Sequence, residues 1–201
     1  MPLKRLANFF STYQPETKIS TDTVRAAVLC PLYMEKGVLK MLFIKRSQMV
    51  KAHKGEISFP GGVREVQDFS LETTSTRETE EEIGVKERDI TIFGGLDEVN
   101  TTTGFLVSPF IGTIPHPYPF NLSPDEVESL ISLAVGDFFE PCNKVDFYYF
   151  NGRRLEPQLA FNIDGHIIWG ATAKIMGQFL ELGREHDLFA KSTLQTFHLA
   201  S

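Results

Sequence analysis

The sequence of 201 residues has little of what marks disulfide-rich, membrane or nucleic-acid-binding proteins. Its two cysteines, Cys30 and Cys142, are too few for a disulfide framework. No apolar run approaches the ~20 residues of a membrane span. The formal net charge of -6 provides no general basic surface for nucleic acid. We therefore expect a cytoplasmic protein with a buried free thiol at Cys30, no nucleic-acid partner and no membrane span.

The composition is that of a globular protein, with 42% hydrophobic and 23% charged residues. The apolar run at residues 6–10 is too short and too interrupted for a signal peptide. The length suits one domain with a sizeable core. We expect an N-terminal helix or arm at residues 1–23, the main domain at 24–183 and a C-terminal tail at 184–201.

Hydrophobic patterning predicts a mixed sheet that helices cover on both faces. Residues 171–182 are apolar at helical spacing, and Gly183 is expected to end that helix. Residues 123–126 have the chemistry of a turn or a helix start, and a short apolar stretch follows at 127–135. The expected strands are 24–33, 38–45, 89–99 with a break at Gly94–Gly95, 105–114 and 144–150.

Residues 59–85 stand out, because the tetrapeptide Phe-Pro-Gly-Gly is followed by a helix rich in carboxylates. At about 100° per residue, Glu78, Glu81 and Glu82 fall within one ~100° sector, and Glu80 points nearly the opposite way. Three close carboxylates repel one another unless protons or cations intervene, and Mg²⁺ prefers oxygen ligands. The alternative is an ordinary solvated acidic face. A second sector, able to face a core, holds Phe69, Thr76, Thr79 and Ile83.

This stretch resembles the Nudix box, G-x5-E-x7-R-E-U-x-E-E-x-G-U, where U is an aliphatic residue. The matching residues are Gly62, Asp68 at the first acid, Arg77–Glu78, Glu81–Glu82 and Gly84–Val85. Three features depart from the pattern. Asp68 replaces Glu, Thr79 replaces an aliphatic residue, and eight residues rather than seven separate Asp68 from Arg77.

Ahead of the box the chain also resembles the coenzyme A diphosphatase group, whose pattern is close to L-L-T-x-R-S-x3-R-x3-G-x3-F-P-G-G. The matches are Leu42, Arg46–Ser47, Gly55 and Phe59–Gly62, and the departures are Phe43, Ile44 and Lys51. The resemblance implies an α/β/α sandwich with a mixed β-sheet, the box forming a loop-helix-loop. It also implies hydrolysis of the pyrophosphate of coenzyme A or its thioesters. The products would be 3′,5′-adenosine diphosphate and 4′-phosphopantetheine or its acyl form.

The resemblance assigns roles to the residues that match the box. It implies Mg²⁺ or Mn²⁺ held by Glu78 and Glu82, with Glu81 as the third ligand. A backbone carbonyl of Gly61 or Gly62 could complete the shell, since glycine permits close approach. Arg77 is expected to pair with Asp68 and to orient the acids.

The general base and the phosphate contacts remain open. Candidate bases are Glu78 and Glu81 in the box and Glu126 in a later loop, although Glu126 also suits the first turn of a helix. Candidate phosphate contacts are Arg46 and Lys51, together with Arg64, because Arg and Lys suit phosphate oxygens. The alternative for the segment at 46–54 is a polar surface loop.

Aromatic residues offer weaker signals. Phe105, Tyr118 and Phe120 could stack on adenine, but with 17 phenylalanines in the chain core packing is favoured for each of them. Trp169 is expected to be a core anchor.

Other functions compete with coenzyme A hydrolysis. One is a Nudix hydrolase of another small molecule, such as ADP-ribose or NADH. Another is a nucleotide-binding domain without turnover, although Arg77 and all three acids are retained. The sequence does not indicate an oligomeric state.

Overall fold

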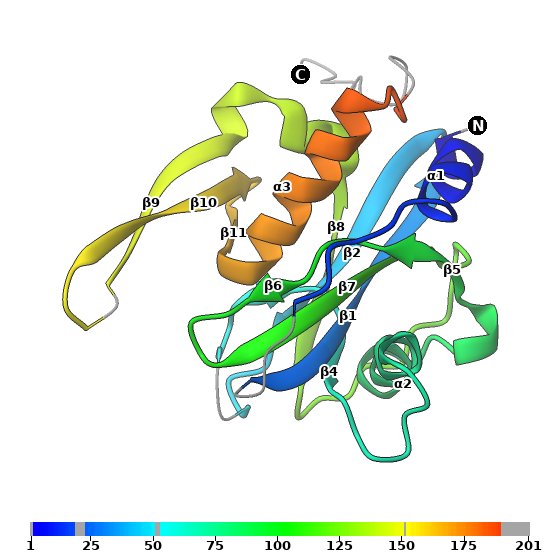
Figure 1. Ribbon diagram of the computed structural model, residues 1–201, viewed down its shortest axis with the longest axis horizontal. Coiled ribbons are helices and arrows are strands. Elements are labelled where there is room, and N and C mark those ends of the chain that lie inside the picture. Colours follow the sequence, from blue (N-terminus) through cyan, green and yellow to red (C-terminus); the bar gives the residue numbers. More distant parts are fainter. Residues whose placement is uncertain (1, 19–22, 51–52, 151, 190–201) are drawn as a thin grey trace.

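The protein is a mixed sheet with helices on both faces, as Figure 1 shows for this computed structural model. Residues 2–18, 23–50, 53–150 and 152–189 are described. The helices are α1 (Pro2–Phe10), α2 (Leu71–Ile83) and α3 (Gly170–Glu185), with short 3₁₀ turns at Glu87–Asp89, Val135–Phe139 and Pro141–Asn143. The strands are β1 (Val24–Glu35), β2 (Val38–Arg46), β3 (Ile57–Ser58), β4 (Gly61–Val63), β5 (Thr91–Gly95), β6 (Val99–Asn100), β7 (Phe105–Thr113), β8 (Val127–Ala134), β9 (Lys144–Phe150), β10 (Leu155–Ile163) and β11 (His166–Trp169).

Strand β1 is the centre of the larger sheet. It pairs in parallel with β7 and antiparallel with β2 and β4, so the sheet is mixed. The main path runs β3-β2-β1-β7-β5, with β8 on β2 and β6 on β7. Strands buried on both faces read as continuous hydrophobic runs, which explains the apolar sequence of β1 from Ala26 to Met34. The expected mixed sheet is confirmed.

Helix α2 covers one face of this sheet and carries the acidic box. Ser70 caps its start by accepting a hydrogen bond from the backbone N–H of Thr73 at 3.1 Å, and Gly84, at φ 77°, ends it. Its buried side packs Ile83 beside Leu29 and Tyr33 of β1. Phe69 lies before the cap and is 95% exposed, so the expectation that it faces the core is wrong.

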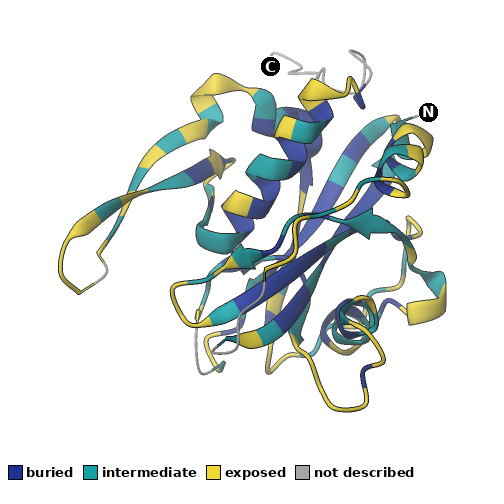
Figure 2. Ribbon diagram, viewed as in Figure 1, coloured by how far each residue is buried: buried dark blue, intermediate teal, exposed yellow. Residues whose placement is uncertain are grey.

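Helices α1 and α3 cover the other face over the larger core (Figure 2). Leu6 and Phe10 of α1 are fully buried there, and Phe10 stacks on Phe179 of α3 with ring centroids 6.1 Å apart. The N-terminal helix therefore shares the core of the main domain. Cys30 is a buried free thiol, as expected, and burial raises its pKa.

A second sheet of β9, β10 and β11 extends beside α3, and its β9–β10 hairpin projects away from the larger sheet (Figure 1). Strand β9 has the predicted bounds. Helix α3 continues past Gly183, which is buried inside it, so the predicted stop there is wrong. A Cβ at this position would lie 1.8 Å from Phe189 Cε2, so glycine serves close packing. The expected C-terminal tail lies mostly outside the described residues.

The apolar stretch after residues 123–126 forms the strand β8, which pairs with β2. Glu126 therefore lies in a turn before a strand, and the alternative of a helix start is wrong. The expected strand at 89–99 is interrupted, but the break lies at residues 96–98 rather than at Gly94–Gly95, since β5 ends at Gly95 and β6 begins at Val99. In the described ranges, no helix is long and apolar enough to cross a membrane.

Candidate functional site

The acidic face of α2 lies against the glycine pair of β4. One Glu82 oxygen, Oε2, accepts the backbone N–H of Gly61 at 2.9 Å, and Glu82 is 3% exposed. The Glu78 carboxylate lies over Gly62, because a Cβ built on that glycine would be 2.5 Å from its atoms. Glu80 points away and pairs with Lys86 at 2.7 Å, as the helical periodicity predicts. The glycines thus bring two box carboxylates against the backbone.

Arg77 organises the box through several carboxylates. Its Nε and Nη2 bind the two oxygens of Asp68 at 2.9 and 3.0 Å, a bidentate pair. It also lies 3.0 Å from Glu78 Oε1 and 3.0 Å from Glu81 Oε2. Asp68 is buried and further accepts hydrogen bonds from the Thr74 hydroxyl and the Glu65 backbone N–H, each at 2.9 Å. The shorter Asp68 reaches Arg77 despite the extra intervening residue.

The electrostatics of the box separate its acids into two kinds. The hydrogen bonds from Arg77 hold the pKa of Asp68 well below its ordinary value. Burial raises the pKa of Glu82 to about 8, although the hydrogen bond from the Gly61 N–H and the positive charge of Arg46 both act to lower it. Burial also raises the pKa of Glu78, against the opposing charge of Arg77. Asp68 is therefore a fixed structural anion, whereas a cation would relieve the buried charge of Glu78 and Glu82.

The donor set fits a hard divalent cation, because it consists of two carboxylates that lie against the glycine pair. Glu78 and Glu82 are close enough for the charge of Glu78 to raise the pKa of Glu82. Glu81 is 55% exposed and turned toward Arg77. Within the described ranges, no three acidic, His or Cys side chains converge tightly enough to enclose a metal ion. Glu81 would have to leave Arg77 to join the other two.

Glu126 reaches the same region from the turn before β8. Its backbone carbonyl accepts the N–H of Ser47 at 2.8 Å, and its exposed side chain is free of the core. Burial is the largest cause of the raised pKa values of Glu78 and Glu82, and the negative charge of Glu126 also raises both. The tertiary fold therefore brings this loop carboxylate to the box.

The three candidate phosphate contacts lie in different surroundings. Arg46 is at the box, with Nη1 3.8 Å from Glu82 Oε1, and its buried Nε has no hydrogen-bond partner among the described residues. Arg64 is exposed and donates to the Asp68 carbonyl at 3.1 Å, apart from the cavity described next. Lys51 lies outside the described residues.

A cavity of about 370 Å³ opens from the glycine pair toward the start of α3. Gly61, Gly62 and Arg46 line it on the box side, and Phe105 of β7 lies on its wall. On the other side it is lined by Tyr149, Gln158, Trp169, Gly170–Thr172 and Lys174. Its volume falls in the range of about 300–1,000 Å³ of small-molecule sites.

Sequence reasoning assigned no role in a site to this second wall. Trp169 lines the cavity and stacks with Tyr149, with ring centroids 5.4 Å apart, so it is not simply a core anchor. Phe105 reaches the cavity, whereas Tyr118 and Phe120 pack against the core beside α2. The four consecutive aromatic residues 147–150 in β9 were the available signal, but nothing local linked them to the box.

The fold and the box together define a hydrolase of phosphoric anhydride bonds, and comparison with known proteins gives its family. The model of the NUDIX domain matches residues 23–168, so the chain belongs to the Nudix family. Enzymes of this family generally use divalent metal cations. The expected family and the α/β fold are confirmed.

Individual relatives are similar over most of the chain. A protein of Citrobacter koseri named Nudix hydrolase NudL, and described as uncharacterized, is 30% identical over 185 residues, covering 89% of this chain and 95% of its own. The NudL protein of Photorhabdus laumondii is 29% identical over 184 residues, covering 88% of this chain and 96% of its own. The crystal structure of a MutT/nudix family protein from Enterococcus faecalis matches with a TM-score of 0.54 and 15% identity. It covers 96% of this chain and 72% of that one, and it supports the fold alone.

Proposed function

We propose that the protein hydrolyses the pyrophosphate of coenzyme A or acyl-coenzyme A. The products are 3′,5′-adenosine diphosphate and 4′-phosphopantetheine or its acyl form. The observation that carries this proposal is a single cavity that joins the box glycines to Arg46. The upstream resemblance to coenzyme A diphosphatases includes Arg46 and the residues Phe59–Gly62, which all lie along or beside this cavity.

The proposed cofactor is Mg²⁺ or Mn²⁺, held by Glu78 and Glu82 with Glu81 as a third ligand and a carbonyl of Gly61 or Gly62. When bound, such a cation neutralises phosphate charge, polarises phosphorus and lowers the pKa of a coordinated water. Arg77 supports the site by fixing the helix to Asp68.

The protein's own groups position the substrate. Arg46 offers a guanidinium nitrogen, Nε, that has no hydrogen-bond partner in the described part of the chain, and this nitrogen can donate to a pyrophosphate oxygen. Phosphate contacts from Lys51 and Arg64 remain predictions, and the observed contact of Arg64 favours a role in holding the box loop. The Tyr149–Trp169 pair offers an aromatic wall for a base.

Three carboxylates remain candidates for the general base that accepts the proton of the attacking water. Glu126 is the strongest of them, because it is exposed and it approaches Glu78 and Glu82 from outside the helix. Glu81 would first have to leave Arg77, and Glu78 is placed to bind metal.

The test is product analysis with coenzyme A beside ADP-ribose and NADH, with Mg²⁺ or Mn²⁺ present and with chelator. Metal-dependent release of 3′,5′-adenosine diphosphate from coenzyme A, at a higher kcat/KM than for the other two substrates, is the expected result. A clear preference for ADP-ribose or NADH would establish the alternative hydrolase. Binding without turnover of any of the three would establish a non-catalytic domain.

A further inference from the structure

The far end of the cavity contains the first turn of α3, with Gly170, Ala171 and Thr172 on its wall. The first N–H groups of a helix lack acceptors within that helix, and they carry the positive end of its dipole. The N-cap residue, Trp169, provides no side-chain hydrogen bond to them. This turn therefore presents uncapped backbone donors to the cavity.

Side-chain hydroxyls on the cavity wall are the independent sign of a ligand. Thr172 is 8% exposed and lines the cavity, and its hydroxyl makes no hydrogen bond within the described ranges. Ser58 also lines the cavity, and its buried Oγ likewise lacks a partner among described residues. The Thr172 hydroxyl is not one of the enclosed unpaired atoms, so it opens to the cavity and is free to bond a polar group of a ligand.

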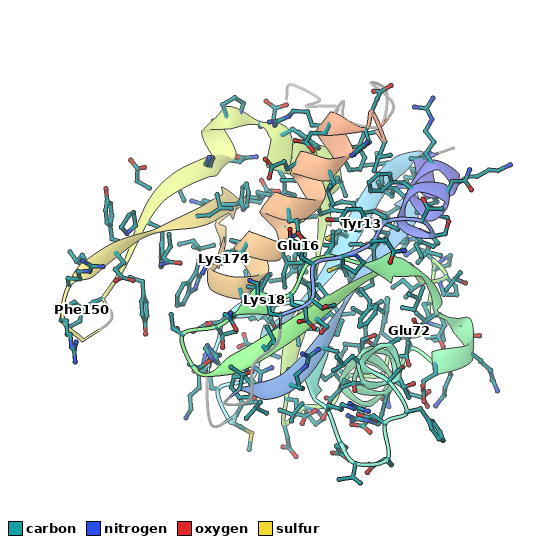
Figure 3. The ribbon with its side chains drawn as sticks, viewed as in Figure 1. Tyr13, Glu16, Lys18, Glu72, Phe150 and Lys174 are labelled. Atoms are coloured by element: carbon teal, nitrogen blue, oxygen red, sulfur yellow. The ribbon has the colours of Figure 1, made fainter. Side chains whose placement is uncertain are left out.

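The charges around the cavity favour an anion. Lys174, one turn beyond Gly170 on α3 (Figure 3), also lines the cavity. In the described part of the chain it makes no ion pair with a carboxylate. Arg46 adds a second cation on the box side. The only carboxylate among the described lining residues, that of Glu56, is paired with His53 Nδ1 at 3.0 Å.

We propose that the start of α3, with the Thr172 hydroxyl and the Lys174 ammonium group, is a second phosphate site. It binds a phosphomonoester of the substrate that is separate from the pyrophosphate at the box. This inference rests on the proposed function and deepens it, because coenzyme A carries such a phosphate on its ribose and ADP-ribose does not. Thr172 and Lys174 then determine specificity without taking part in bond cleavage.

The test compares coenzyme A with dephospho-coenzyme A, which has the same pyrophosphate without the 3′-phosphate. Wild-type protein should prefer coenzyme A. Lys174→Gln should raise its KM about tenfold with little change in kcat, as expected when one charged hydrogen bond to bound substrate is lost. Hydrolysis of dephospho-coenzyme A should stay within about twofold of wild type. Thr172→Val should give the same selective loss without lowering the Tm, because the hydroxyl has no partner to lose.

Lys4→Gln is the matched control, since it removes the same charge from an exposed position on α1. It should leave both substrates unchanged. The proposal is overturned if Lys174→Gln affects both substrates equally, or neither.

A binding measurement separates this proposal from the proposed function. Titration calorimetry should show 3′,5′-adenosine diphosphate binding wild-type protein about tenfold more tightly than 5′-AMP, and Lys174→Gln should remove the difference. If coenzyme A is not hydrolysed but this difference is found, the proposed function fails and the phosphate site stands. If both nucleotides bind wild type equally, the phosphate site is wrong whatever the enzyme hydrolyses.

Discussion

Replacing Glu82 by Gln should abolish hydrolysis and stabilise the protein in metal-free buffer. Glu82 is 3% exposed, and its oxygen accepts the Gly61 N–H, a contact that a Gln carbonyl preserves. Loss of supporting residues around a metal commonly costs 10–100-fold, so loss of a ligand should lower metal-dependent turnover by at least about 100-fold. The fold should remain intact.

The gain in stability follows from the raised pKa. Folding raises the pKa of Glu82 from 4.5 to about 8, so the folded protein holds this proton more tightly than the unfolded chain does. Wild-type stability should therefore fall as the pH rises from about 4.5 to about 8, by at most roughly 5 kcal/mol at 1.36 kcal/mol per pKa unit. Because surroundings relax around a buried charge, we expect Glu82→Gln to gain about 2 kcal/mol above pH 8, or ~6 °C in Tm.

Thermal unfolding with chelator, across this pH window, measures the effect. Wild type and variant should converge below pH ~4.5, where the carboxyl is protonated in both states. Adding Mg²⁺ or Mn²⁺ should raise the Tm of wild type much more than that of the variant. Glu72→Gln is the control, because Glu72 is exposed on the same helix (Figure 3). A variant with the pH dependence of wild type, or near-wild-type turnover, would refute the reasoning.

Three further substitutions test the supports of the box and the packing of α3. Asp68→Asn should lower the free energy of unfolding by roughly 3 kcal/mol at neutral pH, measured by urea unfolding, because it breaks the buried ion pair with Arg77. The pKa of Asp68 is lower in the folded state, so that difference should shrink as the pH falls below about 4; equal stabilities at pH 7 would contradict it. Gly62→Ala should displace the Glu78 carboxylate and lower kcat by about 100-fold with unchanged circular dichroism, and normal turnover would show that Gly62 is dispensable. Gly183→Ala should cost about 2 kcal/mol through contact with Phe189, measured by Tm, with kcat unchanged; a Tm at or above wild type would exclude tight packing there.

Local patterns determined much of what could be read before the fold was seen. The 3.6-residue period placed Glu78 and Glu82 on one side of α2 and Glu80 on the other, because angular position on a helix depends only on spacing. Alternating or continuous apolar runs located β1, β2, β7 and β9, because successive side chains of a strand point to opposite faces of the sheet. The spacing of glycine, arginine and acids in the box was specific enough to give the family.

Sequence patterns did not decide the local structure where the same pattern suits two different structures. An eight-residue apolar stretch suits a strand or a helix, and pairing with β2 decided that Val127–Ala134 is a strand. Gly183 has the appearance of a helix stop in the sequence, but in the fold the Phe189 ring lies where a side chain at this position would be.

The cavity was decided by the tertiary structure alone. Its two walls come from the box and from Trp169–Lys174, which are distant in the chain. Their meeting depends on how the second sheet and α3 pack over the larger one. The same holds for Arg77, because its contact with Asp68, beside those with Glu78 and Glu81, depends on where the loop folds back. Periodicity fixes directions within one element, whereas cavities and ion pairs depend on contacts between elements.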